Sequence, residues 1–151
     1  MNMKTRIYVD TSVFSALSDE RMPERMALTM EFWARRHDFD LAVSDLVREE
    51  LERISDPSRR QDLLARLKET RMLGITEDMN ALAYGYVQAG CFPPAMFSDA
   101  LHVAVAVLSR QDILVSWNFR HMVNRTRRAR VNAMNIEKGL PVLDILAPPE
   151  V

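Results

Sequence analysis

The sequence contains little cysteine and no long apolar run, and both absences limit the classes of protein it can belong to. Its one cysteine, Cys91, excludes an internal disulfide and leaves no Cys/His spacing for a zinc site. No apolar segment approaches the roughly 18 residues needed to cross a bilayer. Met1–Arg6 leads directly into the first predicted strand and does not resemble a signal peptide. We therefore expect a cytoplasmic protein without a membrane partner.

The motifs of several common enzyme classes are also absent. There is no P-loop, no GxGxxG and no nucleophile elbow of a Ser-His-Asp hydrolase, so NTP binding, dinucleotide binding and acyl transfer lack support. The formal net charge is −1, which gives no overall indication of nucleic-acid binding. One late segment contains a cluster of arginines without an acid among them, which is either a phosphate-facing patch or a solvated surface. The cluster consists of Arg120, Arg125, Arg127, Arg128 and Arg130.

The residues that are present predict an alternation of strands and helices in one domain, residues 1–151. At 48% hydrophobic residues the chain can bury a core. Short apolar runs alternate with segments of helical periodicity, which indicates a parallel α/β sheet. The predicted strands are 7–9, 39–43, 72–75, 112–117 and 140–145. The predicted helices are 24–36, 46–54, 57–70, 77–89 and 96–108, with a short helix or ordered loop in the arginine-rich segment.

Asp10 directly follows the first predicted strand. In open α/β sheets, ligands bind at the carboxyl ends of the strands. An ionised carboxylate buried there is costly unless it is paired or bound to a metal. Asp10 therefore either caps the following turn or helix, together with Thr11 and Ser12, or belongs to a binding site.

Glu50 lies within the apolar stripe of the predicted helix 46–54. It stands three residues after Val47 and four before Ile54, whereas Glu49 and Glu52 point away from the stripe. An acid in this position either reaches water from the rim of the core or faces a site.

The segment 96–108 is apolar almost all the way round, which predicts a helix buried on most sides. Its polar residues gather near the start and include Asp99 and His102. The helix dipole alone can explain Asp99. His102 is interpreted as a satisfied core histidine or as a partner of a ligand. Asn118 follows a further predicted strand and is a fourth polar group of the same kind.

The topology of a parallel sheet predicts that these groups meet at one edge. Several carboxylates brought together without a cation would repel one another and raise one another's pKa values. The cluster makes chemical sense if it holds a hard divalent cation, Mg²⁺ or Mn²⁺. Such an ion can promote phosphodiester hydrolysis by activating water and offsetting charge.

Four segments, in this order and spacing, resemble PIN-domain nucleases and most closely the VapC-like toxins of type II toxin–antitoxin systems. They are Val9–Phe14, Ser44–Leu51, Asp99–Ala104 and Leu114–His121. The resemblance implies a three-layer α/β/α sandwich with a central, mainly parallel sheet. It also implies a metal-dependent endoribonuclease acting as a toxin on RNA, a small antitoxin that blocks the site, and a homodimer.

Carried onto this sequence, the resemblance makes Asp10, Glu50 and Asp99 the metal ligands and catalytic residues, with Asn118 as a fourth catalytic residue. Many members have an acid at the position of Asn118, and its uncharged amide leaves open whether one ion or two are held. Candidate substrate contacts are Ser12, His121, Arg127 and Arg128, and local hydrogen bonding to the backbone is the alternative for His121.

Two other functions remain open. Asn118 and the arginine cluster are compatible with a catalytically inactive RNA- or protein-binding module on the same fold. An aspartate-nucleophile phosphatase would use Asp10, but such enzymes have a second aspartate two residues later, where this chain has Ser12.

Overall fold

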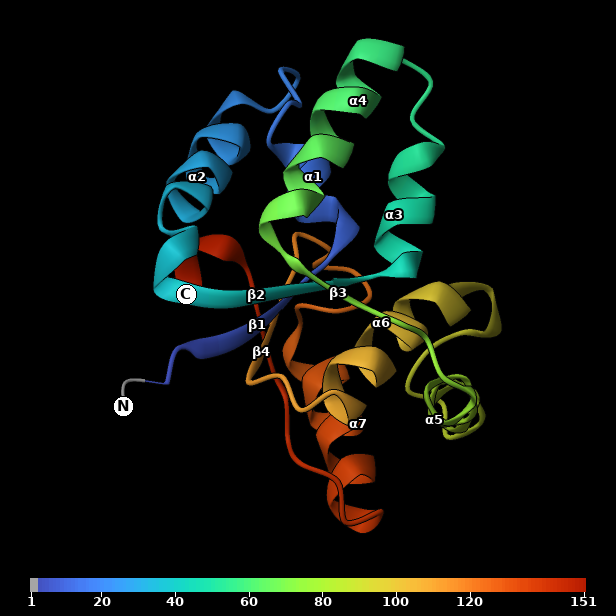
Figure 1. Ribbon diagram of the computed structural model, residues 1–151. Helices are drawn as coiled ribbons and strands as arrows, with labels where there is room; N and C mark the ends of the chain where they lie inside the picture. Colours follow the sequence, from blue (N-terminus) through green and yellow to red (C-terminus); the bar gives the residue numbers. More distant parts are fainter. Residues whose placement is uncertain (1–2) are drawn as a thin grey trace.

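The computed structural model describes residues 3–151 as a central sheet covered by helices on both faces (Figure 1). All neighbouring strands pair in parallel, in the order β3-β2-β1-β4-β5. The order reverses between β1 and β4, which is the topological switch point where open α/β sheets bind ligands. The strands are β1 (Thr5–Val9), β2 (Phe39–Ser44), β3 (Arg71–Leu73), β4 (Ile113–Val115) and β5 (Asp144–Leu146).

The helices form two layers, so the predicted three-layer α/β/α sandwich is confirmed (Figure 1). The upper layer contains α1 (Thr11–Ala16), α2 (Pro23–Ala34), α3 (Asp45–Glu52) and α4 (Pro57–Arg66). The lower layer contains α5 (Glu77–Gln88), α6 (Phe97–Leu108) and α7 (Arg125–Glu137). Short 3-10 helices follow or precede these elements: η1 (Arg36–Asp38), η2 (Leu67–Glu69), η3 (Pro94–Met96) and η4 (Pro148–Glu150).

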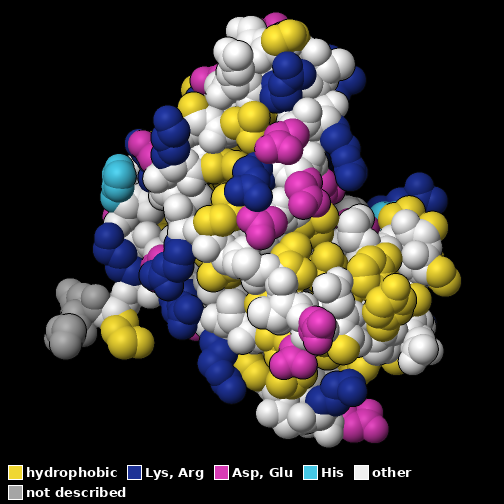
Figure 2. Space-filling view, turned by 45° about the vertical axis from the view of Figure 1, so that its right-hand side comes forward, with side chains coloured by type: hydrophobic (Ala, Val, Ile, Leu, Met, Phe, Trp, Pro, Cys, Tyr) yellow, Lys and Arg dark blue, Asp and Glu magenta, His cyan; other side chains and the backbone are white. Residues whose placement is uncertain are grey.

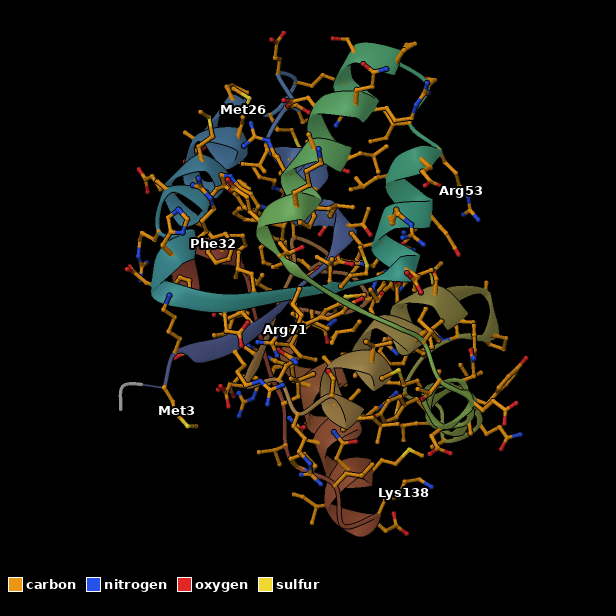
Figure 3. All side chains as sticks on the ribbon, in the orientation of Figure 1. Met3, Met26, Phe32, Arg53, Arg71 and Lys138 are labelled. Atoms are coloured by element: carbon orange, nitrogen blue, oxygen red, sulfur yellow. The ribbon has the colours of Figure 1, made fainter. Side chains whose placement is uncertain are left out.

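The first strand is buried on both faces, as its apolar run predicted. Ile7, Tyr8 and Val9 have no exposed surface. Successive side chains of a strand point to opposite faces of the sheet. Side chains fill the space between the sheet and the helices on both sides (Figure 3). Acidic and basic side chains are interspersed over the upper part of the surface in Figure 2, while hydrophobic side chains gather over its lower part.

Several helix boundaries follow the signals in the sequence. The Asp56 carboxylate accepts from two backbone N–H groups at the start of α4, and Pro57 occupies the first helical position. The Thr76 hydroxyl accepts from the Met79 N–H at 3.2 Å at the start of α5. Gly90 ends the same helix with a φ of +80°, which a residue with a Cβ would adopt only with strain.

Other boundaries differ from the prediction. Strand β4 ends at Val115, earlier than predicted, although the Ser116 N–H still donates to the Leu146 carbonyl at 2.9 Å. The Ser116 hydroxyl donates to Asp10 and accepts from the N–H of Asn118. The arginine-rich segment forms α7, a helix of 13 residues, which is longer than expected. Its N-cap is Asn124, whose side chain accepts from the Arg127 N–H at 2.8 Å. Within residues 3–151, no helix combines the length and the apolar character that crossing a bilayer requires.

Tyr86 on α5 and Asn135 on α7 form a hydrogen bond inside the lower layer, and neither side chain is exposed. We predict that Tyr86→Phe lowers the free energy of unfolding by about 1–3 kcal/mol, because the Asn135 oxygen loses its donor while it stays buried. The matched control is Tyr84→Phe on the same helix, where the residue is 60% exposed. Its free energy of unfolding should change by no more than about 0.5 kcal/mol. Chemical denaturation measures both values, and equal effects would contradict the prediction.

Candidate active site

A cavity of about 420 Å³ lies at the carboxyl ends of the central strands, beside the switch point between β1 and β4. Five residues singled out in the sequence line it together: Asp10, Ser12, Glu50, Asp99 and Asn118. The expected convergence of the three acids is therefore present in the structure. The other lining residues are Thr11, Ser15, Ala16, Asp19, Arg25 and Trp117.

Asp10 is held by two serine hydroxyls, one at the start of α1 and one directly after β4. Its Oδ2 accepts from Ser12 Oγ at 2.5 Å and from Ser116 Oγ at 2.9 Å. The same oxygen accepts from the Ser12 N–H at 3.3 Å, which makes Asp10 the N-cap of α1. Only 5% of the residue is exposed. Asp10 therefore caps a helix and at the same time lines the cavity.

Glu50 reaches the cavity from the buried side of α3, as its position in the apolar stripe predicted. Its Oε1 lies 2.6 Å from His102 Nε2 and accepts from the Thr11 hydroxyl at 3.0 Å. Asp10 Oδ1 lies 3.5 Å from the same histidine nitrogen. One imidazole on α6 thus faces two of the three acids.

The other side of His102 is tied to the sheet. His102 Nδ1 and Ser44 Oγ each lie 2.7 Å from the Tyr8 hydroxyl, and all three residues are buried. Burial raises the pKa of Tyr8, so the phenol stays neutral. A protonated His102 then donates from Nδ1 to Tyr8, and Tyr8 donates to Ser44. This bond explains why Ser44, although it is the N-cap residue of α3, makes no side-chain cap.

The ionisation of this pair follows from its contacts. Burial by itself would lower the pKa of His102, but the hydrogen bond to Glu50 and the charges of Asp10 and Glu50 outweigh it and raise that pKa. Burial opposes the ionised form of Glu50, but the bond and charge of His102 outweigh it and lower the pKa of Glu50. Both shifts favour the charged forms of the pair, His102 protonated and Glu50 ionised.

Asp99 has a different environment. Burial raises the pKa of Asp99, and the negative charge of Asp10 raises it further. The Asp99 side chain does not cap α6, so capping does not explain its position. Its Oδ2 accepts from Asn118 Nδ2 at 3.4 Å, while Asn118 Oδ1 accepts from the His121 N–H at 3.0 Å. The amide nitrogen of Asn118 therefore faces Asp99, while its amide oxygen bonds the backbone of the following turn.

The donor set fits a hard divalent cation by its chemistry. Three carboxylates from three different elements face one cavity, and the pKa of Asp99 is raised by the acids beside it. In residues 3–151, however, no three His, Cys, Asp or Glu side chains already lie close enough to hold a metal ion. Glu50 instead points to His102 and Thr11. A metal would have to draw Glu50 away from these partners.

Three predicted substrate contacts do not line the cavity: His121, Arg127 and Arg128. The Arg128 guanidinium donates to the Ile145 carbonyl at 2.9 Å, and the Arg127 guanidinium lies 5.0 Å from the centre of the Phe92 ring. These contacts fix α7 to its neighbours. The His121 Nδ1 atom is buried and has no hydrogen-bond partner among residues 3–151.

The structure also adds residues that the sequence did not single out for the site. Tyr8 and Ser116 hold His102 and Asp10 from the strands, and Arg25 brings a cation into the cavity lining. Tyr8 stands between two apolar residues of a strand and Arg25 in an ordinary amphipathic helix, so neither position carries a local signal.

The structure is thus a parallel α/β fold with three acidic side chains in a cavity at its switch point. The sequence matches the PIN domain family over residues 7–144, and the chain therefore belongs to that family. A comparison with curated proteins found no match.

Solved structures share the fold. The chain is similar to VapC20 of Mycobacterium tuberculosis, described as a sarcin–ricin loop cleaving toxin, with 20% identity and a TM-score of 0.59 over 76% of this chain and 92% of that one. It is also similar to VapBC2 of Rickettsia felis bound to a promoter DNA fragment, with 12% identity and a TM-score of 0.58 over 95% and 98% of the two chains. A toxin–antitoxin complex from Klebsiella pneumoniae has 18% identity and a TM-score of 0.57 over 80% and 93%.

We predict that Asp99→Asn raises the melting temperature of the metal-free protein by a few degrees, because it removes a half-buried charge that Asp10 repels. The control is Asp78→Asn in the first turn of α5, where the acid is exposed. That change removes a favourable helix-dipole interaction and should lower stability slightly. Calorimetry in EDTA measures both, and a destabilised Asp99→Asn protein would contradict the repulsion.

Proposed function

We propose that this protein is a metal-dependent endoribonuclease that hydrolyses RNA phosphodiester bonds. The observation that carries the proposal is the convergence of Asp10, Glu50 and Asp99, from three separate elements, on one cavity at the switch point of a PIN-domain sheet. Three carboxylates in one cavity suit a cation and repel a bare phosphate, so the arrangement favours metal-assisted phosphodiester chemistry.

Asp10, Glu50 and Asp99 would hold the ion, Mg²⁺ or Mn²⁺, as oxygen ligands. When bound, the ion would supply an activated water and would offset negative charge on the phosphate. The other residues position these acids. Ser12 and Ser116 fix Asp10.

Two further groups orient the remaining acids. His102 and Thr11 both contact Glu50 Oε1, so they hold it at the cavity and define the position it leaves when an ion binds. Asn118 donates to Asp99, which assigns it a positioning role in place of the direct metal contact that an acid would make.

We further propose that the nuclease is the toxin of a toxin–antitoxin pair, with a small antitoxin that blocks the cavity. The structural neighbours support this, since they are toxins or toxin–antitoxin complexes. Homodimer formation and a cytoplasmic location belong to the same proposal.

The first test is cleavage of a broad RNA panel by antitoxin-free protein with Mg²⁺. We expect Asp10→Asn, Glu50→Gln and Asp99→Asn each to lower the cleavage rate on the order of a hundredfold. Loss of a residue that supports a metal ligand typically lowers activity by about 10–100-fold, and loss of the ligand itself should cost at least as much. EDTA should abolish cleavage. Glu49→Gln is the matched control, since that neighbouring acid is exposed, and it should retain the wild-type rate. Equal cleavage by wild type and all variants would refute the site.

The second test concerns the partner. We expect the product of an adjacent small reading frame, with a DNA-binding N-terminal half, to co-purify with the protein and to inhibit cleavage. Co-expression followed by size-exclusion chromatography measures the complex. Failure of every adjacent product to bind would remove the toxin–antitoxin part and leave the nuclease part standing.

The amide at Asn118 keeps one alternative open, a catalytically inactive RNA- or protein-binding module. It predicts RNA binding that weakens steeply with salt but no metal-dependent cleavage by any preparation. The RNA panel above distinguishes the two functions.

A further inference from the structure

Arg25 occupies an unusual position in this acidic cavity. Among residues 3–151 it is the only Lys or Arg side chain that lines the cavity with Asp10, Glu50 and Asp99. Its guanidinium nevertheless makes no ion pair and no hydrogen bond within those residues, although the chain forms many such contacts elsewhere. An arginine that lines an acidic cavity without engaging its acids keeps its N–H groups available for an incoming anion.

Two aromatic rings hold the Arg25 side chain in place. The guanidinium carbon lies 4.7 Å from the centre of the Trp117 ring and 5.8 Å from that of Phe119. The two rings meet edge to face, with their centres 6.0 Å apart. Trp117 is buried, whereas Phe119 is 46% exposed. Phe119 therefore presents an aromatic surface to solvent beside the cavity.

Hydrogen bonds through Thr29 also fix Trp117 to α2. Trp117 Nε1 donates to the hydroxyl of Thr29 at 2.8 Å, and that hydroxyl donates to the Arg25 carbonyl at 2.7 Å. Thr29 is fully buried. One threonine thus fixes the indole to the helix that carries the arginine. A second hollow of about 440 Å³ shares Arg25 and Trp117 with the cavity, and its other lining residues are Arg21, Met22, Pro23, Glu24 and Leu28.

We propose that Arg25 and Phe119 form a nucleotide clamp next to the cavity, in which Phe119 stacks on an unpaired base of the RNA and Arg25 binds the adjoining phosphate. The clamp rests on the proposed function, because it assigns the substrate class as RNA with an unpaired nucleotide beside the scissile bond. Exposed aromatic rings bind single-stranded bases, and arginine recognises phosphate through paired N–H groups. A base inside a duplex has no free face to stack, so duplex RNA would leave Phe119 unused.

The test measures binding in a Glu50→Gln background with Mg²⁺, so that RNA stays intact if the proposed function holds. The probe is a short single-stranded RNA with one 2-aminopurine, whose fluorescence is quenched by stacking. A set of such RNAs places the reporter at each position in turn. We expect quenching at one position, and Phe119→Ala should remove it and weaken binding about tenfold. Phe119→Tyr should retain both.

Arg25→Ala should weaken binding and lower the slope of log affinity against log salt by about 0.7, the value for one phosphate contact on a single strand. Phe119→Ala should leave that slope unchanged, because stacking releases no counterion. An abasic site at the quenched position should reproduce the loss caused by Phe119→Ala. Duplex RNA should bind equally to the parent and to Phe119→Ala.

Matched controls come from the same chain. Arg35, near the other end of α2, lies 5.3 Å from the Phe39 ring and does not line the cavity. Tyr84 is an exposed aromatic whose ring centre lies 4.7 Å from that of Phe97. Arg35→Ala and Tyr84→Ala should bind RNA like the parent. Thermal unfolding of every variant shows whether it is folded.

The outcomes separate the clamp from the nuclease. Unchanged binding by Phe119→Ala and Arg25→Ala, or no binding of single-stranded RNA at all, overturns the clamp. If Phe119→Ala and Arg25→Ala lose antitoxin binding but bind RNA normally, the clamp is also overturned, since the surface then serves a protein partner. If the wild type never cleaves RNA but the quenching depends on Phe119, the clamp stands and the nuclease function fails.

Discussion

The contact between Glu50 and His102 is the constraint on which the rest of the site depends. Carboxylates gathered at a strand edge are stable only if a positive charge or strong donors compensate them. The buried imidazole of His102 faces Glu50 and Asp10 on one side and bonds Tyr8 on the other, and the hydrogen bond and charges of the two acids raise its pKa. Through Tyr8 and Ser44 the same ring connects α6 to β1 and β2. A cation entering the cavity would therefore compete with His102 for Glu50.

Residues in this site serve the fold and the chemistry at once. Asp10 caps α1 and also faces the cavity. Ser116, directly after β4, turns its hydroxyl to that carboxylate. Asn118 connects the backbone of the following turn to Asp99. Short polar side chains after β1 and β4 therefore orient the neighbouring acids while they bond the local backbone. Stability and activity are expected to oppose each other at Asp99, because burial and the charge of Asp10 raise its pKa and so disfavour its ionised form.

Much of the fold was predictable because its signals are local. The buried strand Ile7–Val9, the cap at Asp56 and the stop at Gly90 all lie where the sequence placed them. The end of β4 and the full length of α7 were not predictable, since both depend on partners far along the chain. Ser116, directly after β4, bonds Asp10 at the end of β1, and α7 is held by bonds such as that from Arg128 to the β5 backbone.

The sequence by itself determined the fold class and which acids are exceptional, because periodicity decides which carboxylates share a face with the apolar core. Glu50 was distinguished from Glu49 in this way. Only the tertiary structure decided what surrounds those acids. Arg25 lies on an ordinary helical face, and it becomes part of the cavity only because Trp117, Phe119 and α2 meet there. A contact between side chains distant in sequence leaves no local pattern, since it depends on how the elements pack.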